Sequence, residues 1–352
     1  MQNRRYLNPT VEREMIVSGS YDRTLRVWNV ESGALVRVFT GHSTPVTSAA
    51  LSPGGVRVVS GSDDGTLCVW NANTGVCERK LQGYHRRPVI VTAFSPRGTH
   101  IISGSNDGTL CLWSVDGVYV RVLEGHSDMV TNVTFSPDNK YIVGCSSWDQ
   151  TTHVWNVANG RHELTFYSDR AASVAFSPSG ERIISVFDTT VKVWSITGIC
   201  ERTLQAVSDG WINSAALSPG GENIVAGSCY GEVNVWNINT GVCERAFRNR
   251  SGVMSVTYSL DGTRIITGSF DTNVRVWNTI IGVCERTLQG HRDWVSCVAF
   301  GGSCNVSLVG RTIRGTCSPN LLGTSRCGNE LSPDMCHKID MIREQRASFV
   351  PL

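Results

Sequence analysis

The stretch SGSDDGTLCVWN, residues 60–71, is one copy of a pattern that recurs along this chain of 352 residues. Related copies are SGSYDRTLRVWN (18–29), SGSNDGTLCLWS (103–114) and TGSFDTNVRVWN (267–278). Seven tryptophans at spacings of 39 to 43 residues mark the units: Trp28, Trp70, Trp113, Trp155, Trp194, Trp236 and Trp277. A period near 40 residues predicts a radially repeated β-fold, because one unit cannot bury its own faces.

Each unit contains four short segments with the composition of β-strands. In the second unit these segments are residues 46–52, 56–62, 66–71 and 77–82. They are rich in β-branched residues and are bounded by Gly, Asp, Asn, Ser and Pro, and nothing of helical length has a period of 3.6 residues. The sequence therefore predicts an all-β protein.

The repeated motifs resemble those of the WD40-repeat β-propeller family. Gly-His pairs stand at 41–42, 125–126 and 290–291, and most of the tryptophans follow an Asp by six residues. Trp-Asn or Trp-Ser replaces the Trp-Asp after which the family is named. The resemblance extends over about residues 15–300.

Counting strands predicts how the ring closes. The second, third and fourth strands occur seven times from Met15 onward, but no first strand precedes Met15, and a surplus copy (294–300) follows the seventh unit. We expect this C-terminal strand to complete the first of seven blades, which removes exposed sheet edges. The alternative is that residues 1–14 supply the missing strand and 294–300 begin an eighth blade.

The expected organisation has three parts. Residues 1–14 form an N-terminal extension and residues 15–300 a seven-bladed propeller with overlap closure. Residues 301–352 lose the repeat abruptly, which indicates a disordered tail or an error in the predicted gene structure. This tail holds Cys304, Cys317, Cys327, Cys336 and His337 but no Cys-x-x-Cys pair, so neither a metal site nor a cofactor is expected.

A His, a Ser, an Asp and the Trp recur together within the units. Outside this context the first three suggest a hydrolase, but the set is repeated and lacks a nucleophile-elbow motif. The family resemblance implies a structural hydrogen-bond network instead. It is complete for blade one (His291, Ser18, Asp22, Trp28), blade two (His42, Ser60, Asp64, Trp70) and blade three (His85, Ser103, Asp107, Trp113).

The resemblance also implies where a partner binds. We call top face the side that carries the loops before each first strand and between each second and third strand. Two positions per blade vary there: one seven residues before the Trp, the other at the start of the first strand. Those with aromatic, Met or Arg side chains, which are enriched at binding hot spots, are Tyr21, Trp148, Phe187, Phe270, Trp294, Trp211, Met129 and Arg170.

Composition limits the functions that fit. The formal net charge is +2 without runs of like charge, so neither nucleic acid nor a membrane surface is an expected partner. No apolar run approaches about 18 residues. The odd total of 13 cysteines, with no secretion signal, indicates free thiols and a cytoplasmic protein, with a nuclear location as the alternative.

These features favour a non-enzymatic scaffold that binds a protein or peptide on the top face, as a subunit of a multiprotein complex. One alternative is a propeller hydrolase, for which the sequence offers no unique nucleophile. A second is a propeller that binds a glycan or nucleotide. The third is the sensor fragment of a larger NTPase-linked signalling protein, because near-identical units such as GVCERTLQG (282–290) resemble such arrays.

Overall fold

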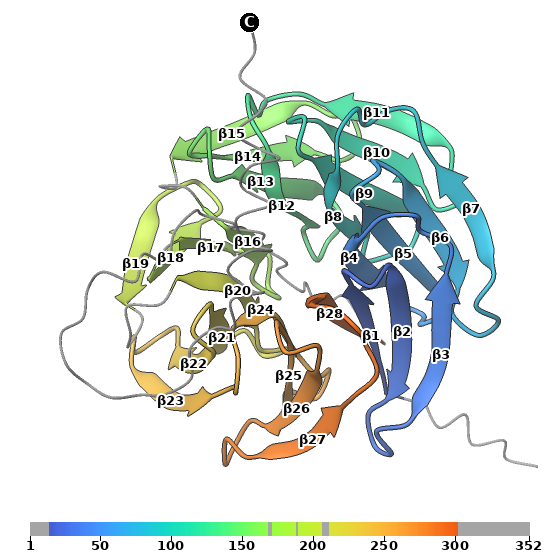
Figure 1. The fold of residues 1–352 in the computed structure, drawn as a ribbon. Helices are drawn as coiled ribbons and strands as arrows, with labels where there is room; N and C mark the ends of the chain where they lie inside the picture. The colour runs from blue at the N-terminus through green and yellow to red at the C-terminus, as the bar shows by residue number, and fades with distance from the viewer. Residues whose placement is uncertain (1–13, 168–170, 188, 206–210, 302–352) are drawn as a thin grey trace, which may run out of the picture. The chain divides into compact units, whose positions relative to one another are not determined.

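The described residues of the chain form a ring of seven four-stranded antiparallel sheets, the blades of a β-propeller (Figure 1). The structure is a computed structural model that describes residues 14–167, 171–187, 189–205 and 211–301. This architecture confirms the predicted all-β, seven-bladed fold. No helix in these ranges is long and apolar enough to cross a lipid bilayer.

The first four blades follow the predicted order of strands. Blade one contains β28 (Val295–Gly301), β1 (Met15–Ser20), β2 (Thr24–Asn29) and β3 (Leu35–Thr40). Blade two contains β4 (Val46–Leu51), β5 (Arg57–Ser62), β6 (Leu67–Asn71) and β7 (Cys77–Leu81). Blade three contains β8 (Val89–Phe94), β9 (His100–Ser105), β10 (Leu110–Ser114) and β11 (Tyr119–Leu123). Blade four contains β12 (Val130–Phe135), β13 (Tyr141–Ser146), β14 (Thr151–Asn156) and β15 (His162–Tyr167).

The last three blades repeat the same order. Blade five contains β16 (Ser173–Phe176), β17 (Arg182–Phe187), β18 (Thr190–Ser195) and β19 (Cys200–Gln205). Blade six contains β20 (Ile212–Leu217), β21 (Asn223–Ser228), β22 (Glu232–Asn237) and β23 (Cys243–Arg248). Blade seven contains β24 (Val253–Tyr258), β25 (Arg264–Ser269), β26 (Val274–Asn278) and β27 (Cys284–Leu288).

The ring closes by overlap of the two ends of the repeat region. Strand β28 pairs antiparallel with β1, and Ile16 lies opposite Phe300. Closure by the C-terminal strand is therefore confirmed, and the alternative of an eighth blade is wrong because this strand belongs to blade one (Figure 1). Residues 1–13 and 302–352, which hold nearly all of the predicted extension and tail with its cysteines, lie outside the described residues.

Neighbouring blades pack through a repeated contact between a glycine and a valine. A Cβ added to Gly61 of β5 would lie 2.5 Å from Cγ1 of Val89, the first residue of the innermost strand of the next blade. Four other glycines meet the equivalent valine in the same way: Gly19 with Val46, Gly104 with Val130, Gly227 with Val253 and Gly268 with Val295. The missing side chain makes room for the valine, so the SGS motif sets the packing of one blade on the next.

Candidate functional site

In five blades the two variable positions lie side by side on the top face. There the backbone N–H of the residue seven before the Trp donates to the carbonyl of the residue just before the first strand. These pairs are Tyr21 with Trp294 (3.0 Å), Asp63 with Pro45 (3.2 Å), Asn106 with Pro88 (2.9 Å), Cys229 with Trp211 (2.9 Å) and Phe270 with Gly252 (3.1 Å). Spacing in the sequence therefore locates a rim of paired positions in these five blades.

The candidate partner-binding residues differ in exposure. Trp148 is 54% exposed, and four others are half-buried: Tyr21, Phe187, Trp211 and Phe270. Met129 is only 3% exposed and Trp294 only 6%, so the expected exposure does not hold at these two positions. Arg170 lies outside the described residues.

Aromatic packing explains why Trp294 is buried. Its ring lies 5.4 Å from that of Tyr21 and 4.9 Å, edge to face, from that of Phe270. The three rings form one cluster at the junction of blades one and seven, and such pairs stabilise packing beyond their buried area. Met129 carries a flexible, wholly apolar side chain that packs into the interior without leaving a polar group unpaired.

Two exposed tyrosines belong to the rim although they are not among the predicted site residues. Tyr167 is 77% exposed and ends β15 opposite Thr151, so it lies at the top of blade four. Tyr230 is 49% exposed and follows Cys229 in the turn between β21 and β22. Counting back seven residues from the Trp finds neither of them, because Tyr230 stands six residues before Trp236 and Tyr167 ends an outermost strand.

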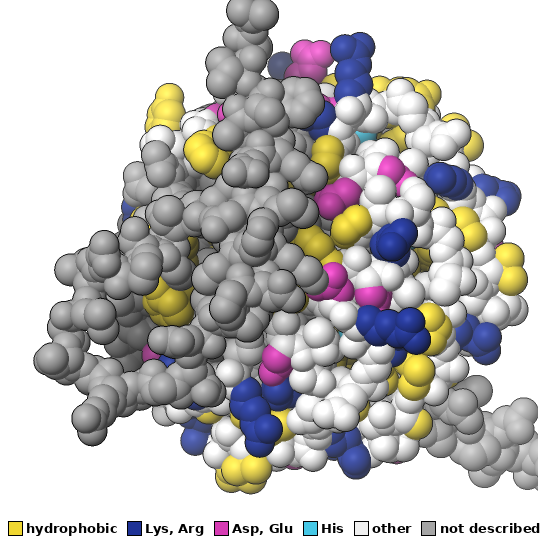
Figure 2. Space-filling view, viewed as in Figure 1, with side chains coloured by type: hydrophobic (Ala, Val, Ile, Leu, Met, Phe, Trp, Pro, Cys, Tyr) yellow, Lys and Arg dark blue, Asp and Glu magenta, His cyan; other side chains and the backbone are white. Residues whose placement is uncertain are grey.

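Of the four exposed aromatic side chains in the described residues, Trp148, Tyr167 and Tyr230 lie in blades four and six and Tyr84 in blade three; the half-buried Phe187 and Trp211 lie in blades five and six. We call aromatic arc the set of Trp148, Tyr167, Phe187, Trp211 and Tyr230. Across the ring, the positions seven before the Trp in blades two and three are polar, Asp63 and Asn106. Where Figure 2 shows described residues, side chains of both charge signs lie among hydrophobic ones.

Beneath the top face, Ser, His and Trp meet in blades one to three. In blade one, Ser18 Oγ lies 2.8 Å from His291 Nε2 and accepts the indole N–H of Trp28 at 2.9 Å. The serine-histidine and serine-tryptophan distances are 2.7 and 2.8 Å for His42, Ser60 and Trp70, and 2.7 and 2.9 Å for His85, Ser103 and Trp113. All three serines are fully buried, so a substrate cannot reach their hydroxyls as a hydrolase would require.

Among blades one to three, the fourth member of the network, the Asp, joins the histidine closely only in blade one. His291 Nδ1 lies 3.0 Å from Asp22 Oδ2. In blade two the corresponding oxygen of Asp64 instead accepts the Ser43 hydroxyl. In blade three Asp107 lies 3.9 Å from His85, whose Nδ1 is 2.8 Å from the Thr109 hydroxyl. The expected network of four residues thus has only three in blades two and three. In blade two the Ser43 hydroxyl binds the Asp in place of the histidine, and in blade three the Thr109 hydroxyl binds the histidine in place of the Asp.

Burial and hydrogen bonding set the charges in these networks. Burial lowers the pKa of His42 to about 4 and also lowers the pKa of His291. Burial alone would raise the pKa of Asp22, but hydrogen bonds from His291, Thr24 and the Arg292 N–H outweigh it and hold that pKa below its usual range. The networks therefore contain neutral imidazoles beside ionised carboxylates at neutral pH.

Blade seven replaces the histidine by a buried arginine. Arg275 is 5% exposed, and its guanidinium donates to Asp271 at 2.6 and 3.1 Å. It also donates to Asn249 Oδ1 at 2.9 Å, and Asn249 occupies the position of the missing histidine. The indole N–H of Trp277 still donates to Thr267 at 2.9 Å. A charged side chain so deeply buried is tolerated because each hydrogen bond is to a carboxylate, an amide or a hydroxyl.

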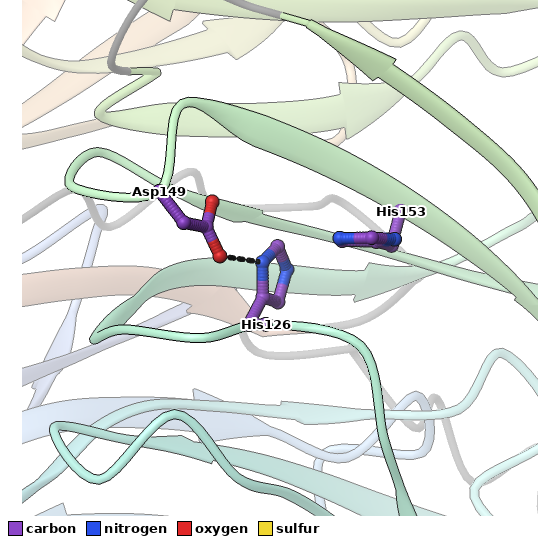
Figure 3. A group of neighbouring side chains, drawn as sticks. All are labelled: His126, Asp149 and His153. Carbon is purple, nitrogen blue, oxygen red and sulfur yellow. Dashed lines mark hydrogen bonds and ion pairs between the residues drawn. The ribbon is translucent and has the colours of Figure 1, made fainter.

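Blade four contains a cluster of ionisable side chains (Figure 3). Cys145 replaces the network serine, and its thiol faces Thr131 and the Ala171 carbonyl. His126, whose side chain is fully buried, keeps its 2.8 Å bond to Asp149, but its Nε2 has no partner. His153 lies beside it, with ring centroids 4.5 Å apart.

Burial, together with the nearby His126 and His162, lowers the pKa of His153 to about 4. Among the described residues, His126, Asp149 and His153 have ligand atoms within 4.8 Å of one another, a spacing that fits a metal ion after modest rearrangement. The sequence does not predict this group, because His126 and Asp149 belong to the repeat motif as structural residues and His153 lies outside that motif.

Comparison with known proteins identifies the family. The chain matches the WD40 family, described as "WD domain, G-beta repeat", over residues 8–29, 33–71, 75–114, 117–156, 161–195, 198–237, 241–278 and 282–312. The chain therefore belongs to the WD40-repeat family, whose propellers are generally non-catalytic and typically act as protein-interaction scaffolds.

Individual relatives match over shorter stretches. The chain is 28% identical over 149 residues to Autophagy-related protein 16 of Arabidopsis thaliana, which covers 41% of this chain and 29% of that protein. It is 29% identical over 131 residues to Protein tipD of Dictyostelium discoideum, covering 36% and 21%. It is 39% identical over 72 residues to an uncharacterized WD repeat-containing protein of Synechocystis, covering 20% and 21%. The chain thus spans less than a third of the length of these relatives.

Proposed function

We propose that this protein is a non-enzymatic scaffold that binds a protein or peptide partner through the aromatic arc of blades four to six. The observation that carries the proposal is Trp148, a large aromatic side chain 54% exposed on the top face. Tryptophan and tyrosine contribute a large share of the energy in protein interfaces, because they bury a large area with few rotatable bonds.

The turn that carries Trp148 is held rigidly from below. The Asp149 carboxylate accepts the backbone N–H groups of Thr151 at 2.9 Å and Ser127 at 3.1 Å. It also bonds to His126 at 2.8 Å. A ring on a fixed turn loses little conformational freedom when a partner binds, which favours recognition.

The family and the relatives support a role in protein assemblies. One relative is named as autophagy-related, and WD40 propellers typically serve as interaction scaffolds. We propose a cytoplasmic protein that acts within a multiprotein complex, with a nuclear location as the alternative. A glycan or nucleotide partner is the second candidate function, since flat aromatic rings also stack on sugars and bases.

Affinity capture followed by mass spectrometry tests the proposal. The double variant Trp148→Ala/Tyr167→Ala is expected to lose at least about tenfold of the captured partner, because removing two aromatic contacts costs more than about 1.4 kcal/mol. Tyr84→Ala, an aromatic residue 46% exposed in blade three, is the matched control and should retain the partner.

Two outcomes would contradict the arc as the protein-binding site. One is equal capture by wild type and double variant. The other is a double variant that keeps its protein partners but no longer binds glycans or nucleotides in a direct binding screen, which would support the second candidate function.

A further inference from the structure

Blade four places two histidines on adjacent outer strands, where the other blades have different residues. His153 of β14 stands two residues before Trp155, where blades one to three have Arg26, Cys68 and Cys111. His162 of β15 lies opposite Trp155 in the sheet register. The same place is taken by Leu35 in blade one and by Cys77 in blade two. The pair is therefore a feature of this blade and not of the repeat.

The two imidazoles and one hydroxyl form a compact triangle of donor atoms. His153 Nδ1 lies 2.7 Å from His162 Nε2. The Thr165 hydroxyl oxygen lies 2.9 Å from the first nitrogen and 2.8 Å from the second. His162 and Thr165 are exposed, whereas His153 is buried, so the triangle lies where the buried network meets solvent.

Counting protons fixes the tautomer of His153. The Thr151 hydroxyl lies 2.6 Å from Asp149 Oδ1, and because an ionised carboxylate only accepts, this hydroxyl donates to it. Thr151 Oγ1 therefore has no proton left for His153 Nε2, which lies 2.9 Å away and must donate. The proton of the neutral ring is on Nε2, so Nδ1 presents its lone pair to His162 and Thr165.

We propose that His153 Nδ1 and His162 Nε2 bind a divalent first-row transition-metal ion of the zinc class. The ion takes the place of the proton on His162 Nε2 that the two nitrogens share. That proton is lost to solvent while the exposed His162 takes up one proton on Nδ1, so both imidazoles bind as neutral ligands and no net proton is released. Thr165 and water complete the coordination. Neutral imidazole nitrogen is a preferred ligand of such ions at about 2.0–2.1 Å, and exposure of His162 lets its ring move by the fraction of an ångström that the ion requires.

A chain of polar groups behind His153 supports this assignment. The ring would donate its Nε2–H to Thr151, which in turn donates to Asp149, and that carboxylate is bound on its other side by His126 (Figure 3). Metal-binding histidines generally have such a partner, which fixes the tautomer and makes the ligand more basic. The inner group of His126, Asp149 and His153 Nε2 is a poorer site, because the Thr151 hydroxyl already occupies the space between them.

Calorimetric titration of the full chain with Zn²⁺ tests the proposal. Exposed thiols are first alkylated with iodoacetamide, because Cys77 and Cys200 are exposed and thiolates also bind zinc. The wild type is expected to bind one Zn²⁺ that His162→Gln does not. His100→Gln, which removes a partly buried histidine from blade three, should leave the binding unchanged.

Two further variants separate the possible ligand sets. Thr151→Val should weaken Zn²⁺ binding by about tenfold or more, the usual effect of losing a supporting hydrogen bond. Identical stoichiometry and affinity in wild type and His162→Gln would overturn the proposal. So would loss of the ion in His126→Gln while His162→Gln still binds, because the inner group would then be the ligand set. Thermal unfolding of each variant shows whether a change in binding reflects a change in folding.

Discussion

His42 shows what one network residue contributes to the fold. Its Nε2 lies 2.7 Å from the buried Ser60 Oγ, so His42→Ala leaves that hydroxyl with one partner fewer and should destabilise by about 1–3 kcal/mol at pH 8. The folded-state pKa is lowered to about 4, so the unfolded state takes up a proton first as the pH falls below about 6.5. The wild type therefore loses stability as the pH falls, whereas the variant, which lacks this imidazole, does not. The difference in unfolding free energy should therefore shrink by about 2 kcal/mol at pH 5. Urea unfolding of both proteins at the two pH values measures it, and a constant difference would contradict this account.

The sequence predicts a side-chain contact wherever the repeat fixes the positions of both partners. The serine ten positions before the Trp meets the indole in blades one to three because both positions are fixed by the same hairpin. Closure, which the sequence predicts, places Trp294 in the same blade as Tyr21. Its packing against Phe270 of blade seven could not be predicted, because it depends on how the loops of neighbouring blades meet. The pairing of Arg275 with Asn249 could not be predicted either, because a strand residue and a loop residue of different chemistry together replace one histidine.

At the scale of elements, two of the seven junctions between blades lack the glycine–valine contact, and the one between blades four and five suggests a pair of substitutions for another junction. Gly61 leaves room for Val89, whereas the equivalent positions between blades four and five hold Ser146 and Ala171, a larger residue facing a smaller one. Gly61→Ser alone should destabilise by about 1–3 kcal/mol through overpacking. Adding Val89→Ala should recover at least about 1 kcal/mol relative to the sum of the two single changes. Chemical denaturation of the four proteins gives this coupling. The control is Gly61→Ser combined with Val253→Ala, which lies at a different junction, so the two changes in unfolding free energy should simply add. If they also added for Gly61→Ser with Val89→Ala, the smaller residue would not compensate for the larger one.

At the scale of the whole molecule, the ring depends on a strand that is supplied from its far end. Strand β28 pairs with β1 and brings Val295, Val298 and Phe300 into a core shared with blade seven. Counting strands predicts this closure, because the closure follows from the number of copies of each strand alone. Spacing from the tryptophans also predicts that the aromatic rim positions lie outside blades two and three. Which of these rings remain exposed could not be predicted, because it depends on which loops pack on one another after closure.

Closure by β28 predicts that a chain cut before this strand is less stable than one cut after it. A chain ending at residue 289 lacks β28 and His291, leaves β1 as an unpaired edge, and loses three buried side chains worth about 1.5–3 kcal/mol each. Its thermal midpoint should lie at least about 10 °C below that of the full chain. A chain ending at residue 301 keeps all seven sheets and is the matched control, expected to unfold close to the full chain. Calorimetry of the three proteins decides the matter. If the shorter truncation product unfolded at the temperature of the longer one, β28 would contribute nothing to stability, and the seven blades would be held by their own contacts without closure.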